Sequence, residues 1–165
     1  MSDSITRRRF AAGIGLSALA AALPGWAFAE DDAAVAFARS LYALPNLWGD
    51  VTADPAAIEQ YLDANLGALI TANYDRSDPE AALDYDPLIQ AQDFETIKAD
   101  FTVRSETATA AIIDASVDNS GEVSPVTLVL TRTDAGWRLS DIRTDEETPS
   151  LVDELKQLNA APASE

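Results

Sequence analysis

The side chains that could do chemistry in this chain are carboxylates, tyrosines, arginines, lysines and hydroxyls, because its 165 residues include no cysteine and no histidine. This composition excludes disulfides, iron–sulfur clusters, histidine- or cysteine-ligated haem, typical zinc sites and Ser-His or Cys-His nucleophilic catalysis. A bound metal would have to be a hard cation held by oxygen atoms. The stretch Asp114–Asp118 begins like a calcium-binding loop, but Asn119 stands where glycine is needed. Pro125 stands where the last glutamate is needed, so we expect no metal and no cofactor.

The best functional candidate among the polar groups of the chain lies between residues 85 and 93. It consists of Tyr85, Asp86, Gln92 and Asp93. An aspartate beside a hydrogen-bonding side chain can act as a general base, or such a group can hold a small ligand. The favoured, structural interpretation is that both aspartates cap helices and that the tyrosine packs in a partly buried position. The four residues remain the best candidate ligand site.

Two further residues complete the candidate ligand-binding set, and no catalytic residue is assigned. Asp141 follows Trp137 in a predicted strand, where it either faces the mouth of a pocket or, more commonly for such a residue, bonds a loop amide or Arg143. Trp48 stands beside Gly49 in a predicted loop, outside any helical stripe. It either plugs the open end of the fold or is exposed as a contact for a partner.

The composition is that of an acidic globular protein of one domain's length. Hydrophobic residues make up 47% of the chain and charged residues 24%, which is typical of a folded domain. The formal net charge is −17, from 28 acidic and 11 basic residues. Such a surface repels phosphate backbones and anionic lipid heads, so we expect no nucleic-acid partner and no stable membrane association. The same charge opposes close self-association and favours a monomer or a weak dimer.

Residues 1–29 have the three parts of a secretory signal peptide. Arg7–Arg9 precede a weakly apolar run, and Ala27–Ala29 form the small-x-small end of a cleavage site. The run Thr6–Phe10 resembles the twin-arginine export signal, in which a hydroxyl residue precedes two arginines, any residue and phenylalanine. The two alanines that follow depart from that signal, which leaves the general secretory route open.

The rest of the leader favours cleavage over an uncleaved membrane anchor, because Pro24 and Gly25 interrupt the apolar run. We therefore predict a removed export signal at residues 1–29, a single domain at 30–159 and a flexible tail at 160–165. The predicted location is the periplasm.

Four expected helix starts share one device, an aspartate or threonine followed by proline. The side-chain oxygen caps free amides, and proline has no amide to leave unpaired. The pairs are Asp54-Pro55, Asp78-Pro79, Asp86-Pro87 and Thr148-Pro149. Apolar residues at helical spacing predict helices over residues 31–44, 55–72 and 149–159, with a short helix at 94–99 capped by Asp93.

Beyond residue 100 the apolar period changes to two, which predicts strands. The first expected strand begins at Phe101, and the second covers residues 107–117. Two more strands lie within residues 123–143, one on each side of a turn. Turns are expected at Asp118–Gly121 and Asp134–Gly136. Helices first, then three or four antiparallel strands, then a helix: this order predicts an α+β fold with helices on one face of a meander.

Two segments resemble a family of bacterial envelope proteins of unknown function. Residues 84–93, DYDPLIQAQD, are similar to its Asp-x-Asp-Pro … Ala-Gln-Asp signature, and residues 137–142, WRLSDI, are similar to its closing strand. The family is placed in the nuclear transport factor two-like, cystatin-like superfamily. The resemblance implies a cone of curved antiparallel sheet with N-terminal helices and a C-terminal helix, an envelope location and no established catalytic activity.

Two hypotheses follow from the residues and the resemblance. The favoured one is an exported, non-enzymatic envelope protein that binds a partner protein or a small ligand. The alternative is a carboxylate-based lyase or isomerase of the ketosteroid-isomerase type, because enzymes of that superfamily place a general-base aspartate inside the cone. It requires an open cavity with Asp86 or Asp93 pointing into it.

Overall fold

A computed structural model describes residues 28–76, 82–145 and 147–161 of the chain. It confirms the predicted α+β class, with helices first, then four antiparallel strands and a closing helix. The helices are α1 (Phe28–Tyr42), α2 (Trp48–Val51), α3 (Pro55–Tyr61), α4 (Ala64–Tyr74) and α5 (Leu151–Ala160). The strands are β1 (Ile97–Glu106), β2 (Ala110–Asn119), β3 (Glu122–Thr133) and β4 (Gly136–Arg143).

The strands pair in chain order, β1-β2-β3-β4, and each neighbouring pair is antiparallel. Ser120 and Gly121 connect β2 to β3 with φ angles of 56° and 101°, the positive values that a tight two-residue hairpin turn requires. Gly136 has a φ of 108° where the β3–β4 turn ends. Both predicted turns are therefore confirmed. Register shifts at residues 103–105 and 129–130 bend the sheet, as bulges do.

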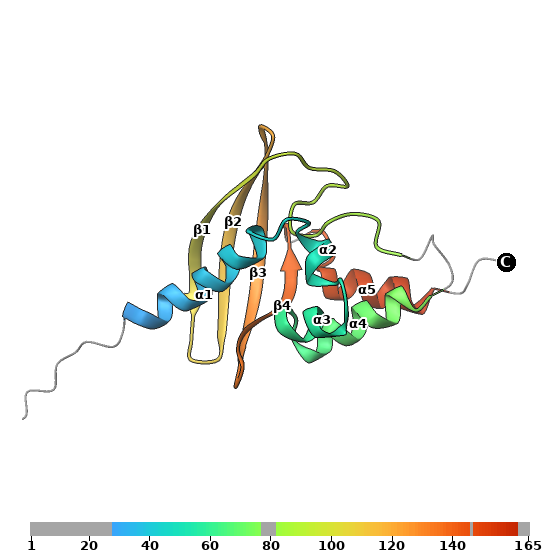
Figure 1. Cartoon of the computed structure of the whole chain (residues 1–165), viewed down its shortest axis with the longest axis horizontal. Helices are drawn as coiled ribbons and strands as arrows, with labels where there is room; N and C mark the ends of the chain where they lie inside the picture. Colours follow the sequence, from blue (N-terminus) through green and yellow to red (C-terminus); the bar gives the residue numbers. More distant parts are fainter. Residues whose placement is uncertain (1–27, 77–81, 146, 162–165) are drawn as a thin grey trace, which may run out of the picture.

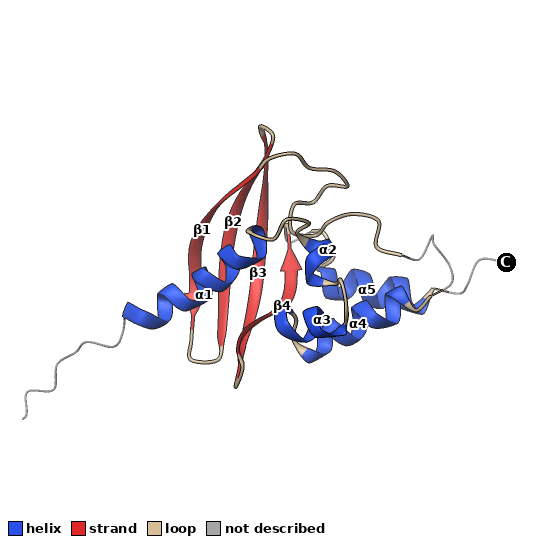
Figure 2. Cartoon of the chain, viewed as in Figure 1, coloured by secondary structure: helices blue, strands red, loops and turns tan. Residues whose placement is uncertain are grey.

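The core lies between one face of this curved sheet and the helices. Alternate residues of β2, β3 and β4 point into it, as period-two strands require. The buried strand residues are Ala111, Ile113, Ala115, Val117, Val126, Leu128, Leu130, Trp137, Leu139 and Ile142. Figure 1 shows α1 lying against the sheet, where it contacts β1, β2 and β4, whereas α3, α4 and α5 gather beside β4. The colouring by secondary structure in Figure 2 makes the same division plain.

The predicted helix over residues 55–72 is wrong in one respect, because the chain breaks at Leu62 and Asp63 into α3 and α4. Leu62 is extended there, with φ −105° and ψ 152°. The backbone N–H of Asp63 donates to the carbonyl of Leu139 on β4 at 2.9 Å. The Asp63 carboxylate then caps the second helix by accepting the N–H of Leu66 at 2.8 Å. The break thus exchanges one turn of helix for a contact with the sheet.

The predicted short helix at residues 94–99 is also wrong, because β1 begins at Ile97. The β2–β3 hairpin holds the chain just before that strand. The backbone N–H of Ser120 donates to the Thr96 carbonyl at 3.1 Å, and Asn119 Nδ2 donates to the Asp93 carbonyl at 3.0 Å. Strand pairing across the sheet therefore outweighs the local capping signal of Asp93.

The helix starts predicted at Asp-Pro and Thr-Pro pairs are confirmed only in part. Asp54 caps α3 as predicted, accepting the N–H of Ala57 at 2.9 Å ahead of Pro55. Helix α5 begins two residues later than predicted, because Ser150 rather than Thr148 is its cap. The hydroxyl and amide of Thr148 are both bonded to Asp145 instead.

Several predicted features lie outside the described residues. These are the Asp78-Pro79 helix start, nearly all of the leader at residues 1–29, and residues 162–165 of the predicted tail. Ala160, the first residue of that predicted tail, is the last residue of α5. Within the described ranges, no helix combines the length and the apolar character needed to cross a bilayer.

Candidate functional site

Asp86 and Trp48 meet where α2 approaches the turn at residues 86–91. Asp86 Oδ2 accepts the backbone N–H of Trp48 at 2.9 Å, and its Oδ1 accepts that of Leu88 at 2.8 Å. The backbone N–H of Asp86 donates to the Ala91 carbonyl at 2.9 Å and closes the turn. Trp48 packs in the core and is only 4% exposed, so its predicted alternative as an exposed partner contact is wrong. Asp86 therefore links the start of α2 to the turn at residues 86–91.

Burial raises the pKa of Asp86 above its ordinary value, although the N–H groups of Trp48 and Leu88 act in the opposite direction. Tyr42 lies close by, and its hydroxyl donates to the Leu88 carbonyl at 2.7 Å. Burial, followed by the negative charge of Asp86, raises the pKa of Tyr42 far above its ordinary value. The phenol is thus a neutral donor that secures the same turn.

The side chain of Tyr85 contacts the C-terminal helix. Its hydroxyl donates to Glu154 Oε2 of α5 at 2.6 Å. Burial first, then the hydrogen bond to Glu154, raises the pKa of Tyr85. Gln92 is exposed, and its Nε2 donates to Asp84 at 3.5 Å. The predicted cluster of residues 85–93 therefore divides into separate contacts.

Asp141 anchors the start of α5 to β4. It is 7% exposed, and its Oδ1 accepts the backbone N–H groups of Ile142 at 3.0 Å and Val152 at 3.1 Å. Its Oδ2 accepts Nε of Arg143 at 3.2 Å. The predicted structural interpretation, a bond to a nearby amide or to Arg143, is thus confirmed. Because Val152 lies in the first turn of α5, the carboxylate also faces the positive end of that helix.

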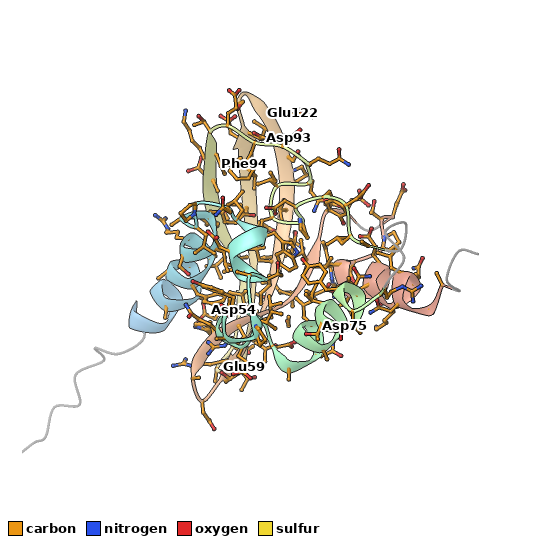
Figure 3. The ribbon with its side chains drawn as sticks, turned by 45° about the vertical axis from the view of Figure 1, so that its right-hand side comes forward. Asp54, Glu59, Asp75, Asp93, Phe94 and Glu122 are labelled. Carbon is orange, nitrogen blue, oxygen red and sulfur yellow. The ribbon has the colours of Figure 1, made fainter. Side chains whose placement is uncertain are left out.

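The last predicted residue, Asp93, is exposed beside the hairpin between β2 and β3. Figure 3 shows Asp93, Phe94 and Glu122 together at this end of the molecule. We define the tip surface as Asp93, Phe94, Glu95, Asp118, Glu122 and Val123. Phe94 is 37% exposed and Val123 is 61% exposed, and both are large apolar side chains.

The tip surface has a fixed backbone and a strongly acidic character. Asp118 Oδ1 accepts the N–H of Gly121 at 2.6 Å, which secures the turn. The bonds from Ser120 to Thr96 and from Asn119 to Asp93 fasten the preceding chain to it. The sequences 92–100 and 116–124 contain one basic residue, Lys98, against five acidic ones.

Two sizeable grooves lie elsewhere in the described part of the chain. The first, about 470 Å³, lies between α3, α4 and the β3–β4 turn, and we call it the helix groove. The second, about 950 Å³, lies between β1–β3 and the start of α5. Its Arg104 makes a bidentate bond to Asp114 at 2.9 and 2.6 Å, and its Lys156 pairs with Asp153 at 3.2 Å. The cations of this second groove are therefore already paired.

Neither Asp86 nor Asp93 lines these two grooves or two smaller pockets of the described part of the chain. The isomerase alternative requires one of these carboxylates to point into an open cavity, and these cavities give it no support. Among the described residues, no three carboxylates gather closely enough to hold a metal ion. The ligand-binding roles of Tyr85, Asp86, Gln92, Asp93, Asp141 and Trp48 remain predictions.

Sequence reasoning missed Phe94, Val123 and the helix groove. The sequence pattern predicts a helix at Phe94 and places Val123 at the start of a strand that packs in the core. The groove follows from the helix break at Asp63. The sequence signal for this break is Asp63 itself, a helix-capping residue within an apolar helical stripe, three positions before the Leu66 amide that it caps.

No protein-family model matches the sequence. No curated protein matches it significantly. A chain of the type VI native effector–immunity complex Tae3–Tai3 from Ralstonia pickettii has a similar structure, with a TM-score of 0.51 and 20% identity over 70% of this chain and 97% of that one. A phospholipid-binding protein from Ralstonia solanacearum, solved with a phospholipid, aligns with a TM-score of 0.41 and 15% identity over 78% of this chain and 81% of that one. The first likeness supports the α+β fold described above.

Proposed function

We propose that this chain is an exported, non-enzymatic binding protein of the cell envelope whose tip surface holds a basic partner protein. The observation that carries the proposal is the exposure of two large apolar side chains at one end of the molecule. Val123 lies on the β2–β3 hairpin and Phe94 on the preceding segment that is hydrogen-bonded to it, and four carboxylates lie on the same two segments. Exposed apolar side chains on a rigid surface are typical of protein contacts, and aromatic residues often dominate their energy. The surrounding charge selects a partner with lysines and arginines.

Three further features support this function over catalysis. Asp86 and Asp141 each have both carboxylate oxygens engaged in hydrogen bonds to backbone or to Arg143. The chain from Ralstonia pickettii, which has a similar fold, belongs to a complex of two proteins. The resemblance of residues 84–93 and 137–142 to an envelope family of the nuclear transport factor two-like superfamily suggests where such a partner is met.

Site-specific photocrosslinking in the native host tests the contact. A benzoylphenylalanine replaces Val123 in one variant and Tyr74 in the other, since Tyr74 on α4 is 47% exposed and lies outside the tip surface. We expect a cross-linked basic protein from the Val123 position and none from the Tyr74 position. The same adduct from both positions, or an acidic partner, would contradict the proposal.

The affinity of this chain for the purified partner, once the cross-link has identified it, then measures how much Phe94 contributes to the free energy of binding. Replacing Phe94 by serine should weaken affinity by about 30-fold, because an aromatic hot spot contributes about 2 kcal/mol. The Tyr74→Ser variant should bind like the wild type. Unchanged affinity of the Phe94→Ser variant would remove the tip surface from the interface.

Export is tested separately by cell fractionation. Replacing Arg7 and Arg8 by lysine should leave the precursor inside the cell if the twin-arginine route is used. Arg9→Lys changes the variable position of the same motif and should be exported normally. Normal export of the Arg7/Arg8 variant would assign the chain to the general secretory route, and cytosolic wild-type protein would contradict the envelope location.

A further inference from the structure

The helix groove exists because α3 and α4 meet at an angle instead of continuing as one helix. Leu62 is extended at the junction, and the N–H of Asp63 is held by the Leu139 carbonyl. Gly67 permits the close packing of the two helices, since a Cβ atom there would lie 2.9 Å from Cγ2 of Ile58. The concave side between the helices faces the β3–β4 turn and forms the groove.

The wall of the groove is mainly apolar. Its apolar side chains are Pro55, Ile58, Leu62, Ala64, Ala68 and Ala135. Its volume of about 470 Å³ lies within the range of about 300–1,000 Å³ that small-molecule sites occupy. Such sites combine apolar walls with a few polar groups that fix orientation.

The polar groups of the groove favour a positive charge. Arg138 is its one basic lining residue, and its guanidinium donates to the carbonyls of Glu59 at 2.9 Å and Trp137 at 2.8 Å. The guanidinium keeps its positive charge, which the two carboxylates of the lining outnumber. The carboxylates of Glu59 and Asp63 also line the groove. Asp63 uses Oδ1 to cap α4, and neither Asp63 Oδ2 nor the exposed Glu59 carboxylate is hydrogen-bonded within the described part of the chain.

We propose that the helix groove binds a small molecule with an apolar body and one cationic group. The apolar body lies along α3 and α4, and the cation lies between the carboxylates of Glu59 and Asp63. The net charge of −17 raises the local concentration of such a ligand. This site is separate from the tip surface, because Figure 3 shows Glu59 at the end of the molecule opposite Phe94 and Glu122.

Binding of three matched amphiphiles, each below its micelle concentration, tests the ligand class. The probes are decyltrimethylammonium, decyl sulfate and decyl maltoside, which share the same tail. In NMR titrations we expect the ammonium probe to bind most tightly, with amide shifts concentrated at residues 58–71 and 133–138. Tighter binding of the sulfate, or shifts spread evenly over the acidic surface, would overturn the proposal.

Paired variants separate the apolar and the charged contributions. Ala68→Leu fills the groove from an exposed helical position and should weaken ammonium binding by about tenfold, whereas Ala56→Leu, outside the groove, should not. Glu59→Gln with Asp63→Asn should reduce the preference for the ammonium over the maltoside by about fivefold, and asparagine keeps the helix cap. Asp75→Asn removes an exposed carboxylate outside the groove and should leave that preference unchanged.

Two results would contradict the assignment outright. One is equal loss of binding in the Ala68→Leu and Ala56→Leu variants, and the other is an unchanged ammonium preference in the Glu59/Asp63 variant. The Phe94→Ser variant should bind the ammonium probe with the affinity of the wild type, because Phe94 does not line the helix groove. The test of the groove therefore stands even if the tip surface proves not to be an interface.

Discussion

At the scale of single residues, Asp141 shows how a carboxylate that resembles a site residue can serve the fold. Its two oxygens receive hydrogen bonds from two backbone amides and one guanidinium, and the residue is buried. One of those amides belongs to Val152 in the first turn of α5. Asp141 therefore fixes where the last helix begins relative to β4.

Replacing Asp141 by alanine should lower the free energy of unfolding by about 3 kcal/mol, because buried N–H groups lose their acceptor. Replacing Arg143 by glutamine should cost less than about 1 kcal/mol, since the arginine side chain is 56% exposed and its ion pair is screened. Urea unfolding of the two variants checks the difference. Equal costs would mean that the ion pair, not the amides, gives Asp141 its effect.

Asp86 makes a prediction about pH, because burial raises the pKa of its carboxyl in the folded state. A carboxyl with a raised folded-state pKa binds its proton more tightly in the native protein than in the unfolded chain. Its contribution to stability is therefore largest in acid and falls as the pH rises from the unfolded value of 3.8 through the folded value. The Asp86→Asn variant lacks this titration.

We expect the stability of the wild type relative to Asp86→Asn to decrease as the pH rises above the ordinary pKa of 3.8. Chemical unfolding at several pH values measures both proteins. A difference that stays constant, or that grows with pH, would show that the amides of Trp48 and Leu88 outweigh burial at this site.

At the scale of elements, the break between α3 and α4 allows a test of how much the Asp63 cap stabilises the fold. Replacing Asp63 by alanine removes the cap of α4 and should cost about 1 kcal/mol. Asparagine at the same position should be nearly neutral, because it caps almost equally well. Thermal unfolding and helical circular dichroism check both variants. A gain in helix content and stability for Asp63→Ala would mean that α3 and α4 prefer to join.

The elements that could be predicted are those whose signals are local. The period-two pattern placed β2, β3 and β4, and the turns at Ser120-Gly121 and before Gly136 were recognisable from turn-forming residues. The break at Leu62 could not be predicted with equal confidence, because it depends on a carbonyl 77 positions later, at Leu139. The strand at Ile97 likewise depends on its partner, β2.

The candidate site was predicted less well than the fold, because its residues act through distant partners. Tyr85 bonds Glu154, 69 positions away, and Asp86 bonds Trp48, 38 positions away. The sequence identified the interesting segment, residues 84–93, without showing that its side chains separate into different contacts. Exposure of Phe94 and Val123 likewise requires knowledge of what packs beside them.

At the scale of the whole molecule, the dominant feature is the net charge of −17. Repulsion among like charges opposes the compact state. The ion pairs Arg104–Asp114, Arg143–Asp141 and Lys156–Asp153 work in the opposite direction, but each includes a side chain more than half exposed and contributes no more than about 1 kcal/mol. Salt weakens both effects, and the repulsion involves far more charges.

The melting temperature should therefore rise when sodium chloride is increased from about 0.01 M to about 0.5 M, as the screening length falls from about 30 Å to a few ångströms. Potassium and lithium chloride should act equally at the same ionic strength, because screening depends on charge and not on the identity of the cation. Scanning calorimetry across the three salts measures the trend. A melting temperature that falls with salt would assign more stability to the ion pairs than their exposure allows, and an effect of one cation alone would indicate specific binding. A rise shared by all three salts would show that self-repulsion of the acidic surface limits the stability of this fold.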